Sequence, residues 1–127
     1  MARIKFDPNL PVIVLEVTLE SMIAKRRMKM AVDTGATYTM IPWEIAEALG
    51  YRPDISSQRI TLVTASGVER VPLIKVDIIR ILGKEIRDTE IVCHDLPARS
   101  YVNGLLGLKS LKELKAKIDF DKGILEI

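Results

Sequence analysis

The stretch that decides the fold of this chain is Ala31-Val32-Asp33-Thr34-Gly35-Ala36-Thr37. An apolar pair leads directly into an aspartate, a residue that is depleted from strands and costly to bury without hydrogen-bond partners. The small residues that follow predict a tight turn, in which backbone N–H groups can bond to the carboxylate while one of its faces stays open. Asp-Thr-Gly is also an ordinary turn tripeptide, so the surrounding sequence has to distinguish a structural turn from a functional site.

Short apolar runs on both sides of this segment predict a mainly β domain. They alternate with period two, are rich in Val and Ile, and are separated by turn residues. The expected strands are 15–20, 28–32, 59–64, 68–79, 85–93, 117–120 and 124–127. Residues 21–26 are expected to connect the first two strands, with Lys25-Arg26-Arg27 at a solvated hairpin tip.

Two segments have the period of short helices instead. The first begins after Ile41, because Pro42 suits a first helical position and Gly50 suits the residue just past the end. The second carries leucines at three helical spacings within 108–114. An apolar run meets a glycine at 32–35 and again at 105–107, with a helix following in each case. This weak repeat predicts two similar half-units.

Length and composition limit the classes of function. The 127 residues suit a single domain spanning 1–127. Nineteen basic against seventeen acidic residues are too balanced to favour nucleic acid, and one Cys with one His argues against a disulfide framework or a zinc site. No apolar stretch is long enough for a membrane span, and the start lacks a signal-peptide pattern. We therefore expect a cytoplasmic protein without metal, cofactor, nucleic acid or membrane partner.

The order and spacing of these pieces resemble the retropepsin-like aspartic proteases, in particular the stand-alone cellular branch found in prokaryotes. Residues 31–42 are similar to the active-site motif of that family, and Thr64-Ala65-Ser66-Gly67, between two strands, is similar to its flap hairpin. Leu105-Leu106-Gly107 resembles the apolar-apolar-Gly motif before the last helix, and 117–127 resembles the final strands. The resemblance implies a closed β-barrel with two short helices and an active site on a two-fold dimer axis.

The same resemblance implies a role for each residue of the motif. Asp33 would be catalytic, Thr34 would orient the loop across the dimer axis, Gly35 would permit the turn and Ala36 would leave space beside the carboxylate. Residues 64–67 would cover an extended peptide substrate. Viral members usually have an Arg and then Asp or Asn after the apolar-apolar-Gly motif, whereas this chain has Leu and Lys at 108–109. The way in which subunits pair therefore cannot be copied from the viral enzymes.

Amide hydrolysis by an aspartic protease needs two carboxylates that share one proton. The chain contains one Asp-Thr-Gly, and 105–107 offers no second carboxylate, so a single chain supplies half of a site. The resemblance implies that a homodimer supplies the other half, giving an aspartic endopeptidase. Two alternatives stay open: a weakly active or inactive dimeric peptide-binding or assembly module, and a plain β-barrel interaction domain that leaves Asp33 unexplained.

Cys93-His94 is a further candidate for chemistry, as a thiol nucleophile with its base. Neighbouring residues on a strand point to opposite faces, so these two side chains are not expected to meet. A structural or surface role is therefore expected for both residues.

Overall fold

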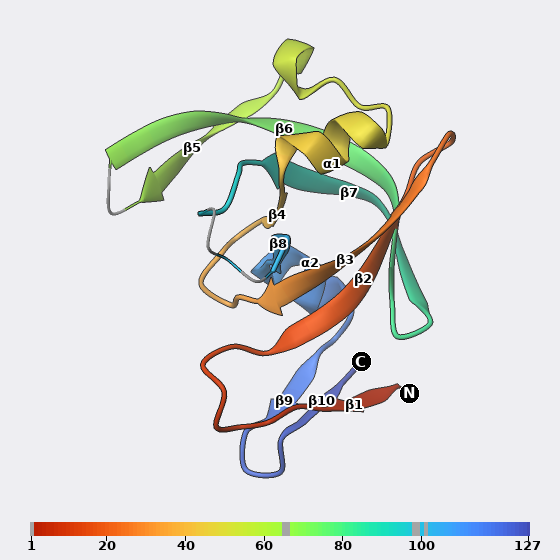
Figure 1. Ribbon diagram of the computed structural model, residues 1–127, viewed down its shortest axis with the longest axis vertical. Helices are drawn as coiled ribbons and strands as arrows, with labels where there is room; N and C mark the ends of the chain where they lie inside the picture. Colours follow the sequence, from red (N-terminus) through yellow and green to blue (C-terminus); the bar gives the residue numbers. More distant parts are fainter. Residues whose placement is uncertain (1, 65–66, 98–99, 101) are drawn as a thin grey trace.

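The computed structural model describes residues 2–64, 67–97, 100 and 102–127, and its architecture is mainly β (Figure 1). Two short helices and a single 3₁₀ turn (Pro53–Ile55) interrupt the strands. The elements are β1 (Arg3–Lys5), β2 (Val14–Glu20), β3 (Lys25–Val32), β4 (Thr39–Ile41), α1 (Trp43–Ala48), β5 (Arg59–Thr64), β6 (Gly67–Ile81), β7 (Lys84–Cys93), β8 (Gly104–Leu106), α2 (Leu108–Glu113), β9 (Lys117–Asp119) and β10 (Ile124–Glu126). No helix in this described part of the chain is long and apolar enough to cross a membrane.

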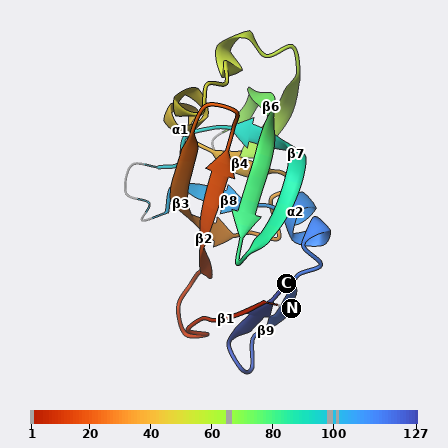
Figure 2. The same ribbon diagram turned by 90° about the vertical axis from the view of Figure 1, so that its right-hand side faces the viewer.

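Six strands close into a barrel, as the resemblance implied. Their order is β2-β3-β8-β4-β7-β6, and β6 pairs again with β2 to complete the ring (Figure 2). Alternate residues of β2 point inward, so that Leu15, Val17 and Leu19 are buried in the core. Full burial of each such side chain contributes about 1.5–3 kcal/mol. β5 pairs only with β6, so the β5–β6 hairpin extends beyond the barrel at the upper left of Figure 1.

The barrel repeats one unit twice. β2, β3, β4 and α1 form the first half, and β6, β7, β8 and α2 form the second. β8 lies parallel to β3 in the same way as β4 lies parallel to β7, and the two halves meet where β4 and β8 pair antiparallel at Met40 and Leu105. The predicted repeat is therefore present, but with a different alignment. Residues 105–107 correspond to 40–42 before α1, and not to 32–35.

The glycines around β8 have a steric reason. A Cβ at Gly104 would lie 2.5 Å from the carbonyl oxygen of Met40, and one at Gly107 would lie 2.4 Å from the carbonyl of Tyr38. Both contacts are with backbone, which cannot move aside without disturbing β4. The glycines therefore allow β8 to fit between β3 and β4, and this explains the apolar-apolar-Gly motif.

The two ends of the chain form a separate small sheet in the order β1-β10-β9, seen at the bottom of Figure 1. Ala2 and Ile127 exchange two backbone hydrogen bonds of 2.9 Å, which pair the first described residue with the last. The rings of Phe6 and Phe120 pack edge to face beside this sheet, with centroids 6.1 Å apart.

Most of the predicted strands and both helices are confirmed, with ends shifted by a few residues. Lys25-Arg26-Arg27 was placed wrongly, because these residues begin β3 and the turn is made by Ser21–Ala24, closed by a 2.9 Å hydrogen bond. Their side chains are exposed as expected, and Lys25 lies 3.2 Å from Glu20. β1, β4 and β8 were not predicted as strands, although β9 and β10, which have the same three-residue length, were.

Candidate active site

Asp33 stands directly after β3, at the mouth of the barrel. Its backbone N–H donates to the Leu106 carbonyl at 3.0 Å, and its carbonyl accepts the Ala36 N–H at 3.3 Å. Its carboxylate Oδ1 accepts the Gly35 N–H at 2.9 Å. The side chain is half-buried. The turn therefore holds one carboxylate oxygen by its own backbone, as the sequence predicted.

Gly35 lies closer to this carboxylate than a larger residue could. A Cβ added at this position would be 3.3 Å from Asp33 Oδ1, which is tighter than ordinary van der Waals contact. Ala36 is half-buried and Thr34 is exposed, so the loop presents its small residues and one hydroxyl toward the solvent. Thr34 also lines a small apolar hollow with Phe6, Leu10 and other residues of the β1–β2 segment.

The N-terminal end of α2 fixes the rest of the loop. The Leu108 N–H donates to the Ala36 carbonyl at 2.7 Å, and the Lys109 N–H donates to the Thr37 carbonyl at 3.0 Å. Lys109 Nζ lies 4.6 Å from the centre of the Tyr38 ring, a cation–π contact. Leu108 and Lys109 are the two positions where the chain departs from the viral pattern. Their backbone N–H groups and the Lys109 side chain thus hold the active-site loop of the same chain.

Two buried hydroxyls join the same parts of the molecule. Thr39 Oγ1 accepts the Gly107 N–H at 3.0 Å and lies 2.6 Å from Ser110 Oγ. Both side chains are buried, so these hydrogen bonds supply the partners that buried hydroxyl groups need. β4, the glycine before α2 and α2 itself are thereby tied together behind the active-site loop.

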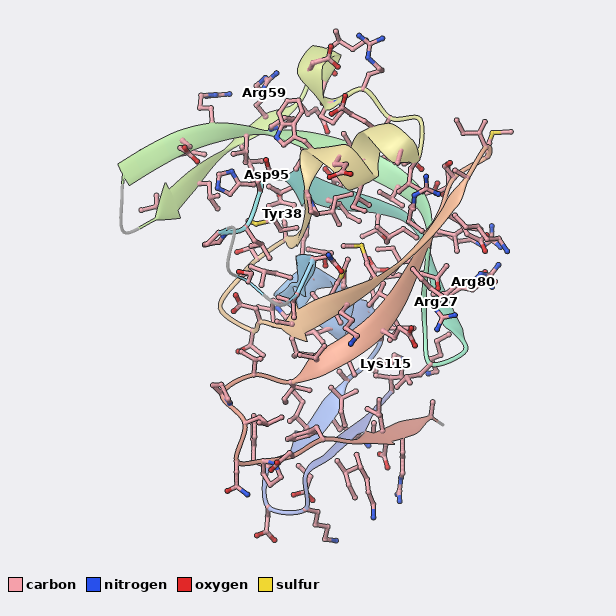
Figure 3. All side chains as sticks on the ribbon, viewed as in Figure 1. Arg27, Tyr38, Arg59, Arg80, Asp95 and Lys115 are labelled. Carbon is pink, nitrogen blue, oxygen red and sulfur yellow. The ribbon has the colours of Figure 1, made fainter. Side chains whose placement is uncertain are left out.

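A groove runs between this loop and β5. A hollow of about 610 Å³ is lined by Asp33, Glu69 and His94, and a neighbouring hollow of about 460 Å³ is lined by Tyr38 and Ile60. The two hollows share five lining residues, Gly35, Ala36, Met40, Leu62 and Val63, and therefore form one continuous groove. Among the described residues, no charged side chain lines the Tyr38 end, whereas the Asp33 end carries ionisable side chains. Figure 3 shows Tyr38 and Asp95 below the β5–β6 hairpin, on the side of the molecule away from Arg27 and Arg80.

The predicted flap falls on the β5–β6 hairpin. Thr64 is the last residue of β5 and pairs with Gly67, the first residue of β6. Ala65 and Ser66, the two other residues predicted for the flap, lie outside the described residues. Val63 and Val68 next to the turn are 75% and 68% exposed, which leaves apolar side chains uncovered at this end of the hairpin.

Cys93 and His94 have separate surroundings, as strand alternation predicted. Cys93 is buried in the main core, and burial raises the pKa of its thiol to about 12, with a smaller contribution from Asp95. Such a thiol stays protonated at neutral pH and is unsuited to act as a nucleophile. His94, in contrast, lines the groove with Asp33.

The internal repeat explains the place of His94. Val32 of the first half pairs with Leu106 of the second, and Cys93 of the second half pairs with Ile41 of the first. The residue after each strand then donates its N–H to that partner's carbonyl at 3.0 Å, from Asp33 to Leu106 and from His94 to Ile41. His94 is therefore the counterpart of Asp33. The repeat predicted from the sequence did not match these two residues, because it aligned 32–35 with 105–107.

The described residues contain no group of three or more His, Cys, Asp or Glu side chains placed to hold a metal ion. Asp95, which also lines the groove, accepts the backbone N–H of Trp43 at 3.1 Å and so binds the start of α1. The chemistry that this arrangement offers is therefore that of a fixed carboxylate beside a peptide-sized groove.

The sequence matches the family described as gag-polyprotein putative aspartyl protease over residues 19–113. The fold is similar to the crystal structure of a retropepsin-like aspartic protease from Rickettsia conorii, with 23% identity, a TM-score of 0.72, and coverage of 97% of this chain and 86% of that one. It is also similar to the solution structure of simian foamy virus (mac) protease, with 19% identity, a TM-score of 0.55, and coverage of 83% and 98%. These likenesses confirm the predicted fold. No match was found among curated proteins.

Proposed function

Because the chain belongs to the family of gag-polyprotein putative aspartyl proteases, we propose that it is an aspartic endopeptidase that acts as a homodimer. The observation that carries this proposal is the carboxylate of Asp33, held by the Gly35 N–H at 2.9 Å and facing a groove that could take a peptide. The chain has one such motif, so the second carboxylate has to come from a second copy. A two-fold axis then brings the same loop of each copy together.

The proposed reaction is general acid–base hydrolysis of an amide. Two carboxylates about 3 Å apart cannot both ionise cheaply, so one keeps its proton. The ionised carboxylate takes a proton from a water molecule, whose oxygen attacks the scissile carbonyl carbon. The protonated carboxyl group meanwhile donates a hydrogen bond to the carbonyl oxygen. Collapse of the tetrahedral intermediate breaks the C–N bond after a proton is transferred to the amide nitrogen.

The proposed substrate is an extended peptide with apolar side chains. The groove passes along β5, and Ile60, Leu62 and Met40 give it an apolar wall. An extended chain lying beside the β5–β6 hairpin could form main-chain hydrogen bonds as an added strand. Thr64, Ala65, Ser66 and Gly67 are proposed as the part of the hairpin that covers this substrate.

The substitution Asp33→Asn tests the proposal. We expect wild-type protein to cleave members of an internally quenched peptide library between about pH 4 and 7. Asp33→Asn should lose this activity, while its molecular mass in solution, which reports dimerisation, stays that of wild type. Asp121→Asn is the matched control, because Asp121 is an exposed turn residue of the terminal sheet. Wild-type cleavage should also fall more steeply than enzyme concentration on dilution, since the site exists only in the dimer. Unchanged turnover in Asp33→Asn would remove this residue from the mechanism.

Peptide binding without cleavage would favour the alternative of a dimeric peptide-binding module. Such a module could use the same groove and hairpin without a productive pair of carboxylates. Measurement of peptide binding beside cleavage, in the same samples, separates the two functions. Binding equal in wild type and Asp33→Asn, with no product from either, is the result that would replace the enzyme with a binding module.

A further inference from the structure

His94 makes a contact across the groove that the proposed reaction does not use. Its Nε2 lies 3.5 Å from Oε2 of Glu69 on β6. The two side chains are 31% and 56% exposed, so both are in contact with solvent. Both also line the hollow that contains Asp33. The His94–Glu69 pair is therefore accessible to a bound peptide and lies beside the candidate catalytic group.

The pair joins two segments that are far apart in the sequence. Glu69 belongs to the hairpin, where it pairs with Leu62 of β5 two residues after Gly67. His94 opens the connection from β7 to β8, which forms the opposite wall of the groove. An attraction between the two side chains would therefore hold the hairpin close to the opposite wall of the groove.

Of the charged side chains that line the hollow with His94, Glu69 is the one that contacts it. The charged groups among the described residues of the hollow are Asp33 after β3, Glu69 on β6 and Asp95 beside His94. Asp33 already accepts the Gly35 N–H, and Asp95 accepts the N–H of Trp43 at the start of α1. The strand β4, which accepts the backbone N–H of His94, carries no charged residue between Thr39 and Ile41.

We propose that the His94–Glu69 pair positions the hairpin over the substrate groove, and that peptide binding weakens when His94 loses its proton. The inference rests on the proposed function of this site. An imidazolium attracts the Glu69 carboxylate, whereas a neutral imidazole does not, and histidine changes charge between about pH 5 and 8. The pair lies on the groove wall and is a positioning pair, so its effect falls on KM and not on kcat.

Kinetics of the full chain test the inference with variants of fixed charge. KM and kcat for one cleaved library peptide are measured at about pH 5.5 and 7.5. Wild-type KM should rise about 2–5-fold between these values, the range expected for an exposed ion pair. His94→Lys keeps a positive charge at both values, so its KM should stay low. His94→Gln and Glu69→Gln should show the high KM at both, with kcat within about twofold of wild type.

The exchanged pair His94→Glu with Glu69→Lys is the rescue control. It restores an attraction with the charges reversed, so its KM should return to the low value at both pH values. Circular dichroism and the thermal midpoint confirm that each variant is folded. A His94→Gln variant with the wild-type KM and the wild-type pH profile would overturn the inference, as would a loss of kcat with KM unchanged.

A binding measurement separates failure of this inference from failure of the proposed function. Fluorescence anisotropy of a labelled library peptide is followed in the Asp33→Asn background, with and without His94→Gln. Weaker peptide binding in the His94→Gln variant supports the positioning role of the pair, even when no variant cleaves peptide. Equal binding overturns that role and leaves the proposed proteolysis unaffected. A protein that neither cleaves nor binds any peptide would overturn both. The chain contains a single histidine, so the NMR signal of its ring reports directly whether bound peptide reaches the pair.

Discussion

Replacement of Thr39 by Val should destabilise the protein much more than replacement of its partner Ser110 by Ala. Thr39 Oγ1 serves two groups, because it accepts the Gly107 N–H at 3.0 Å and bonds to Ser110 Oγ at 2.6 Å. Val keeps the shape of the side chain but leaves a buried N–H and a buried hydroxyl without this partner. Each unsatisfied group costs about 1–3 kcal/mol, so Thr39→Val should cost about 2–6 kcal/mol of unfolding free energy.

Ser110→Ala removes only one of the two bonds. The Thr39 hydroxyl keeps the Gly107 N–H, and the expected cost is about 1 kcal/mol. The double variant should cost less than the sum of the two single ones, because the Ser110 hydroxyl that Thr39→Val leaves unpaired is no longer present. Thr39→Ser, which keeps the hydroxyl, is the control for the lost methyl group.

Urea denaturation at one fixed protein concentration measures all four variants, since dimerisation would make the apparent stability depend on concentration. Equal costs for Thr39→Val and Ser110→Ala would contradict the reasoning, and so would strict additivity in the double variant. Equal costs would mean that the Gly107 N–H finds another partner when Thr39 is replaced, and strict additivity would mean that the Ser110 hydroxyl does.

Two further outcomes are expected. Burial, together with Asp77 and Asp88, raises the pKa of Tyr51 to about 12 from its usual 10, while the Asp77 N–H opposes this by donating to the hydroxyl. The folded state therefore favours the neutral phenol, which contributes about 1 kcal/mol to the free energy of unfolding after a reduction for partial exposure. This contribution is complete below pH 10 and is lost as the pH rises through 12. Urea denaturation at several pH values should show this loss in wild type and not in Tyr51→Phe, and parallel curves would refute it. Gly35→Ala should lower kcat about 3–10-fold, because the added Cβ, 3.3 Å from Asp33 Oδ1, would push this oxygen away by a few tenths of an ångström. The thermal midpoint should change little. An unchanged kcat would show that catalysis does not need the carboxylate in a strict position.

The sequence predicted this fold well where its signals are local. Alternation over six or more residues marks the long strands, and Pro42 and Gly50 mark the ends of the region that contains α1. Asp33 was singled out because it follows Ala31-Val32 and because residues 31–42 resemble the active-site motif of the retropepsin-like proteases, and its catalytic role stays a prediction. β4 and β8 could not be predicted in this way, since each is a three-residue strand that pairs with strands from the other half of the barrel.

The groove was harder to predict than the carboxylate. Glu69 and His94 are 25 positions apart in the sequence, as their contact shows, and neither has an unusual neighbourhood in the chain. Their approach depends on the register of β6 against β7, which places Leu73 opposite Val92 and carries Glu69 past the end of β7. Register is a property of paired strands, so it cannot be read from either segment alone.

The internal repeat places an aspartate and a histidine at equivalent positions of the two halves of the chain. Asp33 and His94 each follow the last residue of a barrel strand and each donate an N–H to the strand beside it. A chain that had to complete its site alone would need a carboxylate at both positions, because the acid–base mechanism needs two of them. Here the second position holds a histidine that contacts the hairpin instead. This difference argues that the second carboxylate comes from another copy of the chain. In the proposed dimer, the equivalent position is then free for the group that we propose to adjust peptide binding. Substitution of His94 by Asp would test that division of roles, and an active monomer from this variant would show that the two positions are chemically interchangeable.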